Sequence, residues 1–138
     1  EVEARECVGL SDADRDQSPF SHREDIASVS DLTEPPAATG DSMGLGTALA
    51  APRVIGATVV LRAVPGLTVE WLQRAIECHL ARNSVLGHDV PEMAYCPLVP
   101  AGVTAVVRSV GDGFAVDIRA DGEDAVAEIV HRARALMP

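Results

Sequence analysis

The chain has 138 residues, a formal charge of −10 at pH 7, eleven cationic side chains that are all Arg, and three Cys. Because nucleic-acid binding depends on clustered cations and the sequence has no basic stripe, that class of function is excluded. No segment approaches the roughly 18 consecutive apolar residues of a membrane span. These features predict one small soluble domain without a dense disulfide framework.

Residues 1–52 are expected to form a largely disordered acidic arm. They contain eleven Asp or Glu against three Arg, a net charge of −8, whereas residues 53–138 have a net charge of −2. The stretch is polar, includes Pro35 and Pro36, and has almost no apolar periodicity. It therefore cannot bury enough surface to offset the entropy lost on ordering. We place the compact domain at residues 53–138.

The first element of that domain is a predicted strand over residues 53–64, which is rich in β-branched side chains. A helix is expected to follow, with Thr68 as its N-cap and an end near Gly87. Its apolar residues form two stripes on roughly opposite sides. The first stripe consists of Val69, Leu72, Ile76 and Leu80, and the second of Trp71, Ala75, Cys78 and Val85.

Residues 87–102 contain three Pro and two Gly, so no long regular element is expected there. The same stretch is rich in apolar side chains, including Met93 and Cys96. We expect this loop to fold back over the second helix stripe, which would bring Cys96 close to Cys78.

A hairpin is predicted over residues 103–120, with its turn at residues 111–113 and with Val116 and Ile118 facing inward. An amphipathic helix is expected from there to Met137, with Asp121 as its N-cap.

The order strand, helix, strand, strand, helix predicts an α+β fold. It corresponds to a ferredoxin-like β-α-β-β-α sandwich, with a three-stranded sheet and two helices on one face. The first strand would then be an exposed edge, covered either by residues 45–51 of the arm or by a second copy of the chain. The order resembles that of heavy-metal-associated chaperone domains. Val64, Pro65 and Gly66 stand in place of their M-x-C-x-x-C loop, so the resemblance concerns the fold alone.

Five residues with soft donor atoms fall within 19 positions: Cys78, His79, His88, Met93 and Cys96. Thiolate, imidazole and thioether together suit copper, and thiolate with imidazole also suits zinc. Cys78 and His79 diverge by about 100° on a helix, so they cannot easily bind one ion together. The expected metal ligands are therefore Cys78, Cys96, Met93 and His88, although no tight C-x-x-C spacing is present.

The same residues support two other interpretations. Cys and Met are common packing residues, so they could simply fix the loop to the helix. Alternatively, a disulfide between Cys78 and Cys96 could hold the loop, which would favour an exported or periplasmic location.

The leading function hypothesis is a soft-metal binding module for copper, with zinc as the alternative ion. The competing hypothesis is a metal-free, disulfide-stabilised or thiol-redox interaction domain. Such a domain would bind a protein partner, or a second copy, through an exposed strand edge or the acidic arm. An enzyme ranks last, because no G-x-S-x-G, H-E-x-x-H or phosphate-binding Gly loop is present.

Overall fold

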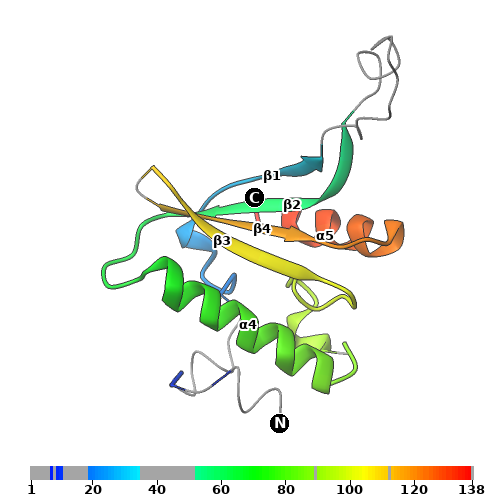
Figure 1. Ribbon diagram of the computed structural model, residues 1–138, viewed down its shortest axis with the longest axis horizontal. Helices are drawn as coiled ribbons and strands as arrows, with labels where there is room; N and C mark the ends of the chain where they lie inside the picture. The colour runs from blue at the N-terminus through cyan, green and yellow to red at the C-terminus, as the bar shows by residue number, and fades with distance from the viewer. Residues whose placement is uncertain are drawn as a thin grey trace, which may run out of the picture.

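The computed structural model describes residues 7, 9–10, 19–34, 52–88, 90–111 and 113–137. This part of the chain is α+β, with a four-stranded antiparallel sheet and two α-helices (Figure 1). None of the described helices is long and apolar enough to cross a membrane. The elements are η1 (Arg23–Asp25), β1 (Ile26–Glu34), β2 (Arg53–Leu61), α4 (Val69–Val85), η2 (Pro91–Met93), β3 (Thr104–Val110), β4 (Gly113–Arg119) and α5 (Glu123–Arg134).

The sheet has one strand more than the predicted ferredoxin-like sandwich. Its order is β1-β2-β4-β3, so β2 is an inner strand and the expectation that it forms an exposed edge is wrong. The additional strand β1 comes from the stretch expected to be a disordered arm, and it pairs with β2 along its whole length. Phe20, from the same stretch, is fully buried in the core. The alternative cover proposed for the edge, residues 45–51, lies outside the described residues.

A bulge near the start of β1 helps to explain why its sequence did not indicate a strand. Ile26 and Ser28 pair with the consecutive residues Leu61 and Val60, so Ala27 is an extra residue in β1. Such a bulge breaks the period-2 alternation of side chains. Ile26 and Val29 therefore share a face although they are three positions apart, whereas Leu32 lies on the opposite face, and only Ile26 is buried within the strand. At the second register shift, between Leu32 and Thr33, the extra residue belongs to β2.

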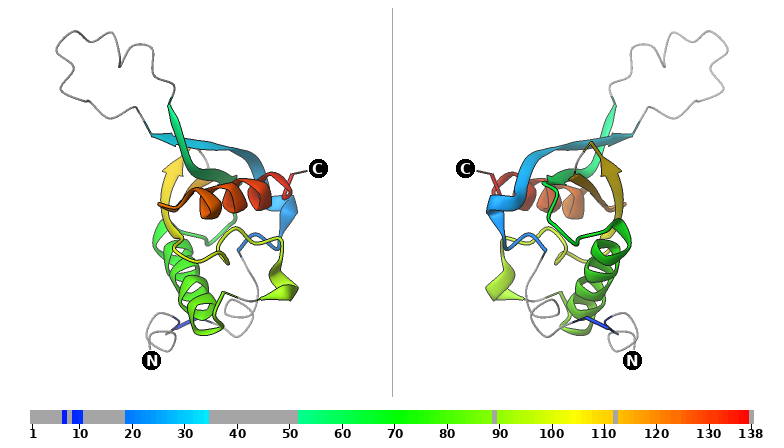
Figure 2. Two further views of the ribbon diagram at one scale, coloured as in Figure 1. Left: turned by 90° about the vertical axis from the view of Figure 1, so that its right-hand side faces the viewer. Right: turned by 90° about the vertical axis from the view of Figure 1, so that its left-hand side faces the viewer.

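Both helices pack against the same face of the sheet (Figure 2). The hairpin is confirmed, and Val116 and Ile118 point into the core with no exposed surface. Residues from all four strands, both helices and the loop after α4 form one buried cluster. It includes Phe20, Ile26, Ala57, Val59, Leu61, Leu72, Ile76, Leu98, Ala105, Val107, Val116, Ile118, Ile129 and Ala133.

The helix ends follow local signals in α4 but not in α5. Thr68 caps α4 as predicted, because its side-chain oxygen accepts a hydrogen bond from the amide of Trp71 at 3.1 Å. The helix stops at Val85, and Gly87 follows with a φ of +68°. In α5 the N-cap is Gly122 without a side-chain hydrogen bond, so the expectation of Asp121 is wrong.

Candidate functional site

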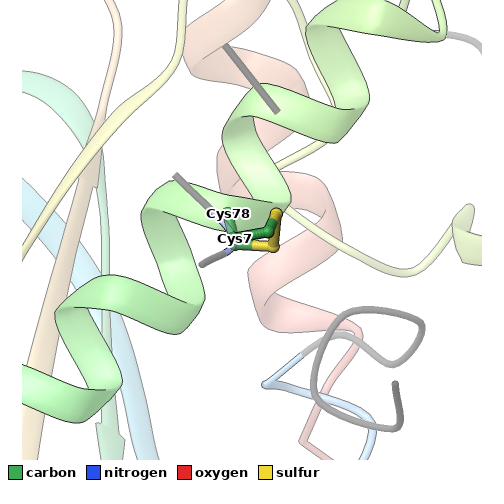
Figure 3. Close-up of a disulfide and its surroundings, with 2 residues drawn as sticks. All are labelled: Cys7 and Cys78. Carbon is green, nitrogen blue, oxygen red and sulfur yellow. A yellow bond between two sulfur atoms is a disulfide. The ribbon is translucent and has the colours of Figure 1, made fainter. Parts of the chain in front are cut away.

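The disulfide joins Cys7 to Cys78, across 71 positions of the chain (Figure 3). Their Cα atoms lie 4.7 Å apart, which is within the range that a disulfide requires. The expectation of a disulfide is therefore confirmed, whereas its predicted pairing of Cys78 with Cys96 is wrong. Cys96 is buried and is not part of the disulfide.

The N-terminal residues, and not the loop, cover the second stripe of α4. Cys7 and Leu10 are 2% and 5% exposed, and they form a small cluster with Cys78 against the partly buried Trp71. The amide of Leu10 donates to the carbonyl of Cys7 at 3.2 Å, which closes a turn. This cluster is separate from the main core that contains Cys96.

The loop of residues 87–102 packs between the two helices instead (Figure 2). On the α4 side, the side-chain amide of Asn83 donates to the carbonyl of Leu98 at 3.1 Å. On the α5 side, the guanidinium of Arg132 donates to the carbonyls of Cys96 at 3.2 Å and Met93 at 3.5 Å. The loop is thus attached to the core as expected, but at a different face of α4.

The contacts do not assemble the four expected metal ligands. The sulfur of Cys78 is bonded to Cys7, whereas a metal binds the thiolate form. Nδ1 of His88 lies 3.0 Å from the carbonyl oxygen of Val99, and because a carbonyl only accepts, this ring nitrogen must donate. Within the described part of the chain, no group of three or more His, Cys, Asp or Glu is placed to hold a metal. This geometry does not support a copper site at Cys78, Cys96, Met93 and His88.

The β3 edge of the sheet is blocked by a side chain of α4. Nε2 of Gln73 donates to the carbonyl of Ala105 at 3.0 Å, and Oε1 of Gln73 accepts from the amide of Val107 at 2.7 Å. These are the two backbone bonds that a neighbouring strand would make. A further strand cannot pair at this position while Gln73 occupies it.

The β1 edge has no equivalent cover among the described residues. The carbonyl of Ile55 accepts a hydrogen bond from the amide of Ala120, which follows β4, so the backbone groups of Ile55 face β4. Successive residues of a strand turn their backbone groups to opposite sides, so those of Thr58, three positions later, face β1. Ser30 pairs with Thr58 and therefore faces β2. Its neighbours Val29 and Asp31 turn their backbone groups outward, where the described part of the chain has no further strand, and no described turn or loop hydrogen bond uses them. Among the described residues, no strand and no side chain pairs with this edge.

The face of the sheet opposite the helices carries a polar network. Asp117 of β4 accepts hydrogen bonds from Thr58 at 2.7 Å and from Arg108 at 2.8 Å. Partial burial alone would raise the pKa of Asp117, but the bonds from Arg108 and Thr58, together with the charge of Arg108, outweigh it and lower the pKa. The network links β2, β4 and β3 and stabilises the ionised carboxylate.

Sequence reasoning missed Cys7, Gln73 and the whole of β1. Only the odd number of Cys residues hinted that Cys7 had a role, since three Cys allow three different single bridges. Comparison of the chain with protein-family models, with curated proteins and with solved structures finds no match.

Proposed function

We propose that this chain is a metal-free, disulfide-stabilised interaction domain that binds an extended segment of a protein partner along β1. The observation that carries the proposal is the contrast between the two sheet edges. At β3 the outward backbone groups are bonded to Gln73, whereas at β1 those of Val29 and Asp31 have no bond among the described residues. Strand addition to an open edge is a recurring way of recognising peptides.

The β1 strand is held in place by its ladder with β2, and two ion pairs add to it, which favours binding without a large ordering cost. Arg134 of α5 contacts both carboxylate oxygens of Asp31 at 2.9 Å. Near the end of the strand, Arg53 of β2 contacts Glu34 at 2.6 Å. These pairs connect β1 to α5 and to β2.

The net charge of the chain favours a partner protein over a second copy of the chain. The two acids of β1, Asp31 and Glu34, are already paired with Arg134 and Arg53. Each copy nevertheless carries a formal charge of −10, so two copies repel each other. A partner segment with cationic side chains avoids that cost.

The test is a selection of twelve-residue peptides from a displayed library on the oxidised, full-length protein. Bound peptides should slow hydrogen exchange at the amides of Val29 and Asp31. They should lose affinity for Val29→Pro, which removes an outward amide without breaking a bond to β2. Val29→Ala is the matched control for the lost side chain, and it should bind within about threefold of the original affinity.

Two results would contradict the proposal. Peptides could protect amides elsewhere and leave those of β1 unchanged. Alternatively, Val29→Pro could bind as tightly as Val29→Ala. In either case β1 is not the binding edge.

The soft-metal module is the competing proposal and requires a reduced Cys78. Copper titration of the reduced protein, compared with His88→Ala and Met93→Leu, separates the two functions. Stoichiometric binding that both substitutions weaken would favour the metal module. Binding that neither substitution changes would refute His88 and Met93 as ligands.

A further inference from the structure

A groove, here called the α5 groove, lies between α5, the end of β1 and the start of β2. Figure 2 shows α5 below these two strands. Its volume of about 590 Å³ falls within the range of roughly 300 to 1,000 Å³ that is typical of ligand pockets. The residues of α5 that line it are Glu123, Val126, Ala127, Val130, His131 and Arg134.

The length of the groove suits an extended peptide. The lining residues recur every three or four positions from Glu123 to Arg134, so the groove follows one side of α5. Eleven helical steps correspond to about 16 Å. An extended chain covers that distance in roughly five residues.

The inner surface of the groove is apolar and only partly covered. Val126 and Val130 of α5 are half-buried, and Ala127 beside them is exposed. On the opposite side, Val54 of β2 lines the groove and is 38% exposed. Together these side chains form an apolar site that one large aliphatic side chain could occupy.

The cationic groups of the groove are already paired. Arg134 contacts Asp31 at 2.9 Å, and Arg53 contacts Glu34 at 2.6 Å. Neither guanidinium therefore presents an uncompensated charge to a ligand.

The acidic groups at the other end of the groove form no ion pair within the described part of the chain. Asp121 and Glu123 are exposed, and neither forms an ion pair with any described residue. The N-terminus of α5 offsets only about half an elementary charge. Two carboxylates exceed that offset, so this end of the groove carries a net negative charge.

We propose that the α5 groove seats an extended partner segment that carries a large aliphatic side chain next to a Lys or Arg. The aliphatic side chain fills the apolar site, and the cation lies against Asp121 and Glu123. The inference rests on the proposed function and deepens it, because Asp31 belongs both to the β1 edge and to the groove. A second copy is a poor occupant, since its own charge is −10.

Three fluorescein-labelled peptides of eight residues provide the probe, with binding to the oxidised, full-length protein followed by fluorescence anisotropy. The first peptide alternates leucine and lysine. The second has glutamate for lysine, and the third has serine for leucine. We expect only the first to bind, with an affinity that falls as salt is added.

Substitutions in the protein then locate the binding. Ala127→Phe fills the groove from an exposed position, and we expect it to weaken binding by at least about tenfold. Ala101→Phe adds the same side chain at an exposed position outside the groove and should have no effect. The double variant Asp121→Asn/Glu123→Gln should also weaken binding about tenfold. Asp124→Asn removes a neighbouring charge that does not line the groove and should leave binding within about twofold.

Several outcomes would overturn the inference. Equal binding of the glutamate peptide would show that the groove has no preference for a cationic ligand. An equal loss of affinity in Asp124→Asn would show that the effect of Asp121 and Glu123 is not specific to the groove. Self-association that Ala127→Phe abolishes would assign the groove to a second copy. Peptide binding that appears only in the double variant Leu45→Asp/Leu49→Asp would show that the connection between β1 and β2 occupies the groove in the original protein.

The β1 proposal can fail separately from the groove proposal. If Val29→Pro leaves binding of the leucine–lysine peptide unchanged while Ala127→Phe abolishes it, the edge is refuted and the groove is supported. If Val29→Pro abolishes binding and Ala127→Phe does not change it, the edge is supported and the groove is refuted.

Discussion

Removal of the disulfide between Cys7 and Cys78 should lower the free energy of unfolding by about 4 kcal/mol. The bridge closes a loop across 71 positions, and the chain-entropy relation for a loop of this length gives that magnitude at 25 °C. Small domains have a total unfolding free energy of about 5 to 15 kcal/mol, so the bridge contributes a large share. Loss of the bridge also releases Leu10, which is 5% exposed, from the surface of α4.

The assay is urea unfolding of the oxidised protein beside the reduced protein and the double variant Cys7→Ala/Cys78→Ala. The reduced protein is the matched control, because it keeps every non-hydrogen atom of both Cys side chains and lacks only the S–S bond. Both should unfold at lower urea concentration than the oxidised protein. Both should also show a steeper dependence on urea, since an uncrosslinked unfolded chain exposes more surface.

A thiol count in denaturant checks the premise separately. The protein has three Cys, so the unreduced chain should show one reactive thiol, that of Cys96. Three thiols would refute the bridge itself. One thiol together with a difference below about 1 kcal/mol would refute the entropic estimate, which assumes that the unfolded chain keeps no structure.

Three further predictions concern the sheet. A Cβ at Gly56 would overlap the backbone carbonyl of Ile118, so Gly56→Ala should cost about 3 kcal/mol of stability in the same urea assay or prevent folding. Gly122→Ala is the control, because its Cβ meets open space, and it should cost about 1 kcal/mol or less. The pKa of Asp117 is lower in the folded protein than its usual value of 3.8, so its stabilising effect is present above that value and is lost as the pH falls through the folded pKa. Urea midpoints measured between about pH 6 and pH 2.5 should therefore fall more steeply for the original protein than for Asp117→Asn, and parallel curves would contradict the assignment. Gln73→Leu removes both bonds to the β3 edge and should increase self-association in sedimentation velocity; unchanged sedimentation would show that Gln73 does not protect the edge.

The α+β class, α4, the hairpin and the inward face of β4 could all be predicted from the sequence, because each depends on neighbouring residues. Thr68 and Gly87 mark the ends of α4 through bonds and dihedral angles within one turn. Val116 and Ile118 alternate with period 2 in a strand that has no bulge. Local signals of this kind do not depend on distant contacts.

The candidate site depended on contacts between segments that are far apart in the chain. The partner of Cys78 is 71 positions away, and nothing near Cys7 indicates which of the other two Cys it should meet. Gln73 resembles any polar residue on a helix until β3 is placed beside it. The bulge near the start of β1 interrupts the alternation by which a strand is recognised, and the strand becomes stable only when β2 supplies its hydrogen bonds. Tertiary structure alone therefore decided the disulfide pairing, the blocked β3 edge and the position of β1 beside β2, because each of these features is a property of two segments and not of either one.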